Sequence, residues 1–276
     1  MSLAADCAAV IPCLNEAPTV ASVVRGVLTH LPAVWVVDDG STDDTHLVAR
    51  AAGAEVVRFD RPRGKGDAIR AGIVAAGARG FRWILLLDGD GQHAVEDIPT
   101  LISAAERTGV EMLIGNRMRQ SESIPWLRRQ VNWWMSRDLS RWTGQDIPDT
   151  QCGFRLVQVA AWNAAVPDGG GFLIESSMLV AFAAAGFRVG HSPVRVLPRT
   201  RGQSRIRSLR DTVRWLRWRR KARRDFRRLH LDPDLDPDLD PDLDLRPTPG
   251  ATDPESARSA QPGSTGLGRL DRRLPG

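Results

Sequence analysis

The chain has few cysteines and lacks the glycine-rich loops that usually hold nucleotide phosphates. Cys7, Cys13 and Cys152 are the only cysteines among 276 residues, and none stands in a Cys-x-x-Cys spacing. This odd number without metal spacing disfavours a disulfide framework and a zinc site, and is typical of small buried residues in a cytosolic protein. No Gly-x-Gly-x-x-Gly follows the first apolar run and no Gly-Lys-Ser/Thr loop occurs, so a nucleotide would need another phosphate site.

Long uncharged apolar runs are also missing. A membrane-spanning helix needs about 18 or more such residues, and the best candidate, 176–187, is shorter and lies between Glu175 and Arg188. The first residues lack the basic start and apolar centre of a signal peptide. We therefore expect a cytoplasmic protein whose contact with the inner face of a membrane is peripheral.

The distribution of charge divides the chain. Residues 231–276 carry a net charge of −5 and open on a repeated Leu-Asp-Pro-Asp unit, whereas residues 1–230 carry +10. Proline at every fourth position prevents a helix, and repelling aspartates oppose a compact state. We predict a globular domain over 1–204, a basic amphipathic helix over 205–230 and a disordered tail over 231–276.

Apolar runs and helical patterns alternate through the first part of the chain. This alternation is typical of an α/β fold with a doubly wound, mostly parallel sheet flanked by helices. The expected strands are 8–11, 34–37, 55–57, 83–87 and 111–114. The expected helices are 18–30, 42–52, 66–79 and 95–108, followed by an Arg- and Trp-rich segment at 126–142, an apolar helix at 174–185 and a basic helix at 208–229.

Two carboxylates, Asp88 and Asp90, follow the apolar run 83–87 and alternate with glycines. Ligands of open α/β sheets collect at the carboxyl ends of the strands, so both side chains should emerge at the mouth of a site. An Asp-x-Asp pair beside glycines turns both carboxylates toward one hard cation, and oxygen ligands suit Mg²⁺ or Mn²⁺. An ordinary Asp-Gly turn is the alternative interpretation.

Other expected strands also end in polar residues. Carboxylates such as Asp38 and Asp39 at a strand end accept hydrogen bonds from ribose hydroxyls or base N–H groups. The neighbouring residues 41–43 are typical of helix caps. Lys65, flanked by glycines where a helix is expected to begin, adds a cation at a place where backbone N–H groups also favour anions.

Six motifs, in this order, resemble family 2 glycosyltransferases with the GT-A fold, most closely the dolichol-phosphate mannose synthase-like branch. They are IPCLNE at 11–16, VDDGSTDDT at 37–45, GKGDAIRAG at 64–72, LDGDGQH at 87–93, GNRM at 115–118 and DTQCGFR at 149–155. The resemblance extends over residues 8–215. The metal motif of the family often reads Asp-Ala-Asp, so Gly89 is a departure that leaves both carboxylates in place.

The resemblance implies a globular domain that binds a GDP- or UDP-sugar donor and a divalent metal, Mg²⁺ or Mn²⁺. With the strand-end carboxylates included, the residues expected to bind the nucleotide sugar are Pro12, Glu16, Asp38, Asp39, Lys65 and Asp88. Those expected around the metal are Asp88, Asp90 and Gln92. The candidate catalytic residues are Asp90, Arg117 and Asp149.

The implied reaction is a single inverting displacement at the anomeric carbon of the sugar. A metal and a nearby cation make the nucleoside diphosphate a better leaving group by neutralising its developing charge. A polyprenyl phosphate, with a second pKa of about 6, is mostly dianionic at neutral pH and needs no general base. With this acceptor Asp149 would orient the sugar or the acceptor, whereas with a hydroxyl acceptor it would be the leading base candidate.

A phosphate acceptor needs cations, and arginines are frequent after the metal motif. Residues 199–205 resemble the family's phosphate-contacting Arg-x-x-Gly-x-Ser-Lys pattern, with arginine in place of the lysine. A solvated surface explains each arginine equally well when it is taken singly. As a cluster, which also includes Arg117 and Arg155, they favour anion binding; the candidates for the acceptor phosphate are Arg128, Arg129, Arg199, Arg201, Ser204 and Arg205.

The basic helix expected near residue 230 indicates an anionic membrane surface as a partner. Residues 205–228 hold twelve Arg or Lys, and Leu209, Val213 and Leu216 form an apolar stripe. Each cation near an anionic bilayer contributes about 1 kcal/mol to binding, and interleaved tryptophans suit the interface. The alternative is a helix packed on the globular domain with a solvated outer face.

Three other functions are compatible with parts of the sequence. Nucleic-acid binding suits the pI near 10.0, but strand-end carboxylates repel a phosphate backbone, so we expect no nucleic-acid partner. A second alternative is a glycosyltransferase whose acceptor is a soluble hydroxyl compound. A non-catalytic binder is disfavoured by the intact pair of Asp88 and Asp90.

Overall fold

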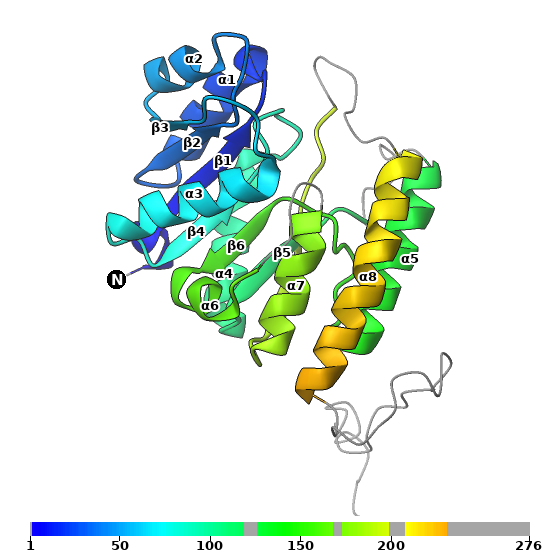
Figure 1. Ribbon diagram of the computed structural model, residues 1–276. Coiled ribbons are helices and arrows are strands. Elements are labelled where there is room, and N and C mark those ends of the chain that lie inside the picture. Colours follow the sequence, from blue (N-terminus) through cyan, green and yellow to red (C-terminus); the bar gives the residue numbers. More distant parts are fainter. Residues whose placement is uncertain (1, 119–125, 168–172, 199–207, 231–276) are drawn as a thin grey trace, which may run out of the picture. The chain divides into compact units, whose positions relative to one another are not determined.

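The computed structural model describes residues 2–118, 126–167, 173–198 and 208–230. Its centre is a seven-stranded sheet with the order β3-β2-β1-β4-β6-β5-β7 (Figure 1). The strands are β1 (Cys7–Cys13), β2 (Val34–Asp38), β3 (Glu55–Arg58), β4 (Trp83–Leu86), β5 (Met112–Asn116), β6 (Arg155–Gln158) and β7 (Val189–Pro193). The α/β fold with a doubly wound, mostly parallel sheet is therefore confirmed.

Two of these strands have no counterpart among those expected from the sequence. β6 is antiparallel to both of its neighbours, β4 and β5, whereas the other pairs are parallel. It has only four residues and begins with a buried arginine, and β7 contains a glycine and a histidine. Neither strand has the long apolar run that predicts the central strands, such as β1, which is buried along almost its whole length.

Helices cover both faces of the sheet. They are α1 (Ala17–Leu28), α2 (Thr45–Ala51), α3 (Lys65–Ala78), α4 (Ile98–Thr108), α5 (Trp126–Thr143), α6 (Val159–Ala165), α7 (Ile174–Ala184) and α8 (Ser208–His230), with short 3₁₀ turns η1 (Leu3–Asp6) and η2 (Val95–Asp97). Figure 1 shows α3, α6 and α7 on the near face and α5 and α8 side by side. The helices expected from the sequence are all present, with small shifts at their ends.

The position of α3 depends on a close approach to the sheet. A Cβ added at Gly72 would lie 2.3 Å from Cγ1 of Val10 in β1 and 3.0 Å from Cγ2 of Val37 in β2. Only a residue without a side chain allows this contact, because protein interiors are close-packed. The approach sets the first residue of α3, Lys65, at the carboxyl edge of the sheet.

The basic helix α8 packs on the domain through its aromatic residues. Trp215 is only 2% exposed and lies edge-on to Trp134 of α5, with ring centroids 5.3 Å apart. Arg219 forms an ion pair with Asp138 of α5. Val213, which the sequence places on the apolar stripe, is instead 48% exposed. The buried face of α8 is thus the tryptophan face, and the stripe points outward at this residue.

Parts of the sequence-based prediction lie outside the described residues. These are the tail 231–276 and the segment 199–207, which spans the predicted boundary at 204/205. Within the described helices, none is both long and apolar enough to cross a bilayer. The three cysteines are buried and free, as expected.

Candidate active site

A half-buried lysine joins three segments at the carboxyl edge of the sheet. The ammonium of Lys65, at the start of α3, lies 2.6 Å from Oδ1 of Asp88, which follows β4. It also lies 2.7 Å from Oε1 of Glu175, in the first turn of α7. The side chains of Lys65 and Glu175 are only 22% and 8% exposed, so this double ion pair is largely shielded from water.

A glycine of the DTQCGFR motif makes room for this cluster. A Cβ added at Gly153 would lie 2.9 Å from Oδ2 of Asp88 and 3.2 Å from Nζ of Lys65. The same residues line a pocket together with Pro12 and Glu175. The loop before β6 therefore passes directly over the lysine and the first carboxylate of the Asp-x-Asp pair.

The electrostatics of the cluster keep Lys65 and Asp88 charged. Burial lowers the pKa of Lys65, but the Asp88 and Glu175 carboxylates outweigh it and raise the pKa above its usual value. Burial raises the pKa of Asp88, yet the Lys65 ammonium and His93 hold it well below its usual range. His93 is 6% exposed and its Nε2 lies 3.5 Å from Oδ2 of Asp88.

The residues predicted to hold a metal lie in one short turn. The backbone N–H of Gln92 donates to Oδ1 of Asp90 at 3.1 Å, and both residues are partly exposed next to Asp88. Among the described residues, no three His, Cys, Asp or Glu side chains converge on one point. Two carboxylates and an amide oxygen fit Mg²⁺ or Mn²⁺ that is bound jointly with substrate phosphates, because these ions rarely use all-protein cages.

The two aspartates after β2 hold the neighbouring loops. Asp39 is 5% exposed and its Oδ1 accepts the backbone N–H of Arg63 at 2.6 Å, while Oδ2 accepts that of Gly64 at 2.9 Å. Asp38 is fully buried; its Oδ1 accepts the N–H of Ser41 at 2.8 Å and its Oδ2 faces Arg58. Both aspartates therefore shape the loops at the predicted nucleoside end of the site.

The loops after β1 and β2 are joined by side-chain hydrogen bonds, one of which involves Ser41, a predicted helix cap. Oγ of Ser41 accepts the N–H of Asn15 at 2.9 Å, and Oγ1 of Thr45 accepts that of Glu16 at 2.8 Å. Asp43 accepts the N–H of Thr45, the first residue of α2, at 3.1 Å. These bonds place Glu16 at the same edge of the sheet as the Asp-x-Asp turn.

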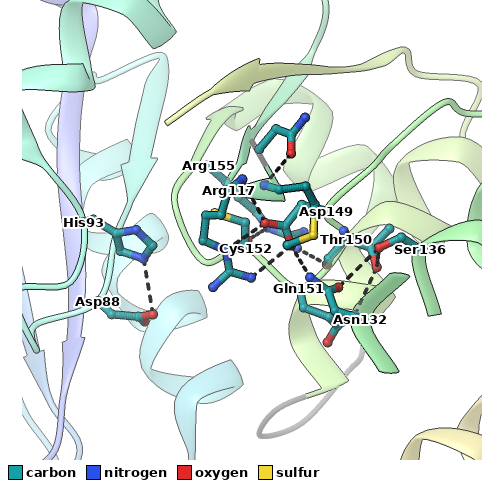
Figure 2. A network of polar contacts seen from close by, with 12 residues as sticks. Asp88, His93, Arg117, Asn132, Ser136, Asp149, Thr150, Gln151, Cys152 and Arg155 are labelled. Atoms are coloured by element: carbon teal, nitrogen blue, oxygen red, sulfur yellow. Dashed lines mark hydrogen bonds and ion pairs between the residues drawn. The ribbon is translucent and has the colours of Figure 1, made fainter. Parts of the chain in front are cut away.

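Asp149 forms a second, separate polar centre (Figure 2). Its carboxylate is buried and accepts the Nε–H of Arg117 at 2.7 Å, the Nη2–H at 2.9 Å and the backbone N–H at 3.1 Å. Nδ2 of Asn132 on α5 donates a further hydrogen bond at 2.8 Å. Burial raises the pKa of Asp149, but the hydrogen bonds and charge of Arg117 outweigh it and lower the pKa.

Arg155, which the sequence includes in the anion-binding cluster, has a structural role instead. It is 1% exposed and donates to three backbone oxygens, those of Cys152 at 2.8 Å, Thr150 at 2.7 Å and Glu175 at 2.7 Å. A buried guanidinium requires such partners. Arg155 thus ties the loop before β6 to the start of α7.

Hydrogen bonds also connect this loop to α8. Nε2 of Gln151 donates to Oγ of Ser176 on α7 at 2.9 Å, and Nε1 of Trp215 donates to the same oxygen at 3.0 Å. Ser136 of α5 and Thr150 share a hydrogen bond of 3.0 Å. The loop is therefore held by α5, α7 and, through one serine, α8.

The residues predicted to bind the acceptor phosphate fall largely outside the described part of the chain. Arg199, Arg201, Ser204 and Arg205 lie in the segment 199–207. Arg128 and Arg129 belong to α5, where Arg129 is partly exposed and the side chain of Arg128 is not described. Arg117 contacts Asp149 as set out above.

Three residues of these polar centres are not among the site residues predicted from the sequence. Glu175, His93 and Asn132 contact Lys65, Asp88 and Asp149 respectively. His93 belongs to the LDGDGQH motif, which indicates that it lies at the same site as Asp88. Glu175 precedes an apolar helical run, where a charged residue needs a partner, whereas Asn132 has no such signal in the sequence.

Comparison with known proteins decides the family. The profile described as Glycosyl transferase family 2 matches residues 8–163. The chain belongs to glycosyltransferase family 2. An uncharacterized glycosyltransferase of Mycobacterium tuberculosis is 34% identical over 210 residues, which cover 74% of this chain and 91% of that protein. A dodecaprenyl-phosphate galacturonate synthase of Rhizobium johnstonii is 33% identical over 55% of this chain and 47% of its own length.

Solved structures agree with this family 2 assignment in their fold. Glucosyl-3-phosphoglycerate synthase from Mycobacterium tuberculosis, in complex with Mn²⁺, uridine diphosphate and phosphoglyceric acid, superposes with a TM-score of 0.58. The sequences are 22% identical, and the match covers 80% of this chain and 78% of the other. The chain therefore has the GT-A-like fold expected from its motifs.

The departure from Asp-Ala-Asp in this family 2 chain has a steric cause. A Cβ added at Gly89 would lie 2.5 Å from Sγ of Cys13, which is buried at the end of β1. We expect Gly89→Ala to lower the free energy of unfolding by about 1–3 kcal/mol, as overpacking does. Cys13→Ala in the same protein should restore most of the lost stability, because the methyl group introduced at position 89 can then occupy the space left by the sulfur of Cys13.

Urea denaturation of the wild type, the Gly89→Ala protein and the double variant measures this effect. Gly77→Ala is a matched control, since a Cβ there would make only an ordinary contact of 3.4 Å with Val159, and alanine favours a helix. A Gly89→Ala protein as stable as the wild type, or a double variant no better than the single one, would contradict the steric explanation.

Proposed function

We propose that this glycosyltransferase transfers a sugar, with inversion, from a nucleotide-sugar donor to a polyprenyl phosphate at a membrane surface. The observation that carries the proposal is the state of Asp149, whose buried carboxylate accepts four hydrogen bonds from Arg117 and Asn132. A carboxylate occupied in this way and with a lowered pKa is a poor proton acceptor. A phosphate acceptor is already ionised and needs none.

The donor would bind at the edge of the sheet formed by β1, β2 and β4. Glu16 and Asp39 lie in the loops after β1 and β2, Pro12 lines the pocket beside Lys65, and Asp38 supports the second loop. The GDP- or UDP-sugar would extend from these loops toward Asp88. This placement follows the rule that ligands of open α/β sheets bind at the carboxyl ends of the strands.

Asp88, Asp90 and Gln92 would hold Mg²⁺ or Mn²⁺ together with the donor diphosphate. The ion supplies positive charge that stabilises the leaving diphosphate. Lys65, which pairs with Asp88, would add a second cation. The glucosyl-3-phosphoglycerate synthase crystallised with Mn²⁺ and uridine diphosphate supports a divalent ion, since the folds match.

Arg117 and Asp149 would act on the acceptor side. The Asp149 carboxylate fixes the guanidinium of Arg117 through two side-chain hydrogen bonds, which leaves its remaining N–H groups to orient an anion. The arginines of α5 and of the segment 199–205 would supply further positive charge for the acceptor phosphate. The relative named dodecaprenyl-phosphate galacturonate synthase supports a polyprenyl phosphate as acceptor.

Exposed apolar and basic residues on α5 and α8 support a membrane surface as partner. Trp126 and Trp133 of α5 are 66% and 52% exposed, and Val213 of α8 is 48% exposed. On α8, the exposed Arg214 and Arg217 lie close to Val213 in the sequence. Aromatic and apolar side chains set among cations are typical of helices at an anionic bilayer interface.

Donor and acceptor are tested together with the metal. Purified protein incubated with radiolabelled UDP- and GDP-sugars and polyprenyl phosphate should carry label into an organic extract, and EDTA should abolish this transfer. Asp90→Asn should reduce transfer about 100-fold, because a ligand charge of the metal is lost (about 2.7 kcal/mol). Asp146→Asn, an exposed aspartate, is the control. Full transfer by the Asp90→Asn protein in EDTA would contradict the metal site.

The role of Asp149 is tested by pH dependence. Its pKa is lowered in the folded protein, so the group stays ionised at neutral pH, and its contribution to stability is lost only as the pH falls through the folded pKa. Asp149→Asn should reduce kcat strongly by freeing Arg117, without removing from the pH-rate profile the low-pH limb that a general base would produce. A limb present in the wild type and lost in the variant would instead identify a general base and a hydroxyl acceptor.

Membrane contact is tested with vesicles. Val213→Ser and Trp133→Ser should weaken co-sedimentation with anionic phosphatidylglycerol vesicles several-fold, because each removes exposed apolar surface. Val74→Ser is the matched control, since Val74 is 67% exposed on α3. Equal binding by all variants would exclude these helices as the contact surface, and no binding by the wild type would exclude the membrane partner.

A further inference from the structure

Glu175 is the one charged residue of α7, a helix that is mostly apolar and buried. It lies in the first turn of α7, whose following residues include the buried Met178 and Leu179. Burying a carboxylate is costly unless it is paired. Its described partner is Lys65, at 2.7 Å, and Arg155 fixes the same residue by donating to its backbone oxygen at 2.7 Å.

The lysine is shared between two carboxylates, of which only one belongs to the metal motif. An ammonium has three N–H donors, and Asp88 and Glu175 occupy two of them. The two carboxylates and one ammonium carry a net charge of −1. The cluster is therefore able to accept further positive charge at Asp88.

A divalent ion at Asp88 and Asp90 would repel the ammonium that lies 2.6 Å from Asp88. Without a second anion the lysine would leave the site, and the diphosphate would lose a cation. Glu175 comes from α7, far from the Asp-x-Asp turn in the sequence, and its carboxylate is not one of the expected metal ligands.

We propose that Glu175 is a positioning residue of the donor site: its carboxylate keeps the Lys65 ammonium in place when a divalent ion takes over Asp88. This inference rests on the proposed metal-dependent transfer. Glu175 would then act on the donor site through Lys65. The close approach of the loop before β6 to the start of α7, which Gly153 allows and Arg155 fixes, serves to place Glu175 beside Lys65.

Binding of Mn²⁺ alone, followed by electron paramagnetic resonance of the free ion, gives a readout that does not depend on the donor. Glu175→Gln keeps the size of the side chain and removes its charge, so Lys65 pairs with Asp88 alone and competes more strongly. We expect the Mn²⁺ affinity to fall about tenfold, which corresponds to the free energy of one hydrogen bond to a charged group. Glu55→Gln, which removes a surface ion pair with Arg79, should leave it unchanged.

A double-mutant cycle separates an action through Lys65 from simple loss of negative charge. In a Lys65→Met background the Glu175→Gln change should have little effect on Mn²⁺ affinity, because no ammonium remains to be held. An equal fall in both backgrounds would indicate long-range electrostatics and overturn the inference. Glu175→Asp, which retains the charge, should recover part of the affinity and serves as the test if the glutamine variant does not fold.

The two proposals fail differently in these measurements. If the Glu175→Gln protein binds Mn²⁺ as tightly as the wild type does, the role of Glu175 is overturned and the proposed function is left intact. No Mn²⁺ binding by the wild type, together with no transfer in the donor panel, overturns the metal site and the inference with it. In transfer assays Glu175→Gln should lower kcat more than it raises the KM for the donor, because Lys65 acts on the developing charge of the leaving group.

Discussion

The ion pairs of Lys65 are the interaction on which the arrangement of this site depends. They join the start of α3, the end of β4 and the start of α7, which are far apart in the sequence. A charge is costly to bury without a partner, so removal of Lys65 would leave the buried Glu175 carboxylate without the ion pair that compensates it. Gly72 brings α3 onto the sheet and Gly153 lets the loop before β6 approach, and both contacts require the absence of a side chain. The packing of the domain and the electrostatics of its site are therefore set by the same few positions.

The two carboxylate centres of the site have different surroundings, and this difference separates their chemistry. Asp88 and Asp90 lie in a partly exposed turn, where a cation and phosphate oxygens can reach them. Asp149 is enclosed by Arg117 and Asn132 and has its hydrogen-bonding capacity engaged. Identical functional groups are thus open to a ligand in one place and anchor a guanidinium in the other, because their burial and their partners differ.

Much of the fold follows from the sequence because it is local. Apolar runs predict β1 to β5, and the helices between them have clear periodic patterns. The proposed metal site is also local, since Asp88, Asp90 and Gln92 are neighbours in the chain. β6 is different: it has four residues, and its place between β4 and β5 depends on pairing across more than 40 residues. Glu175 and Asn132 likewise meet Lys65 and Asp149 across different elements of the fold, so no spacing in the sequence predicts these contacts. Arg155 is predicted to bind an anion because its three backbone carbonyl partners are not evident from the sequence.

A hydrogen bond to Ser176 makes the basic helix α8 part of the packed domain. One hydroxyl oxygen accepts both the indole N–H of Trp215 and the amide of Gln151, and a hydroxyl has only two lone pairs for this purpose. A chain that ended before α8 would leave an opening in the core where the indole now sits, and would expose one side of the loop that carries Asp149. The basic helix α8 thus also covers part of the core, and a force applied to it would reach this loop by two routes. One is the oxygen of Ser176, and the other is α5, which pairs with Arg219 of α8 and is hydrogen-bonded to the loop.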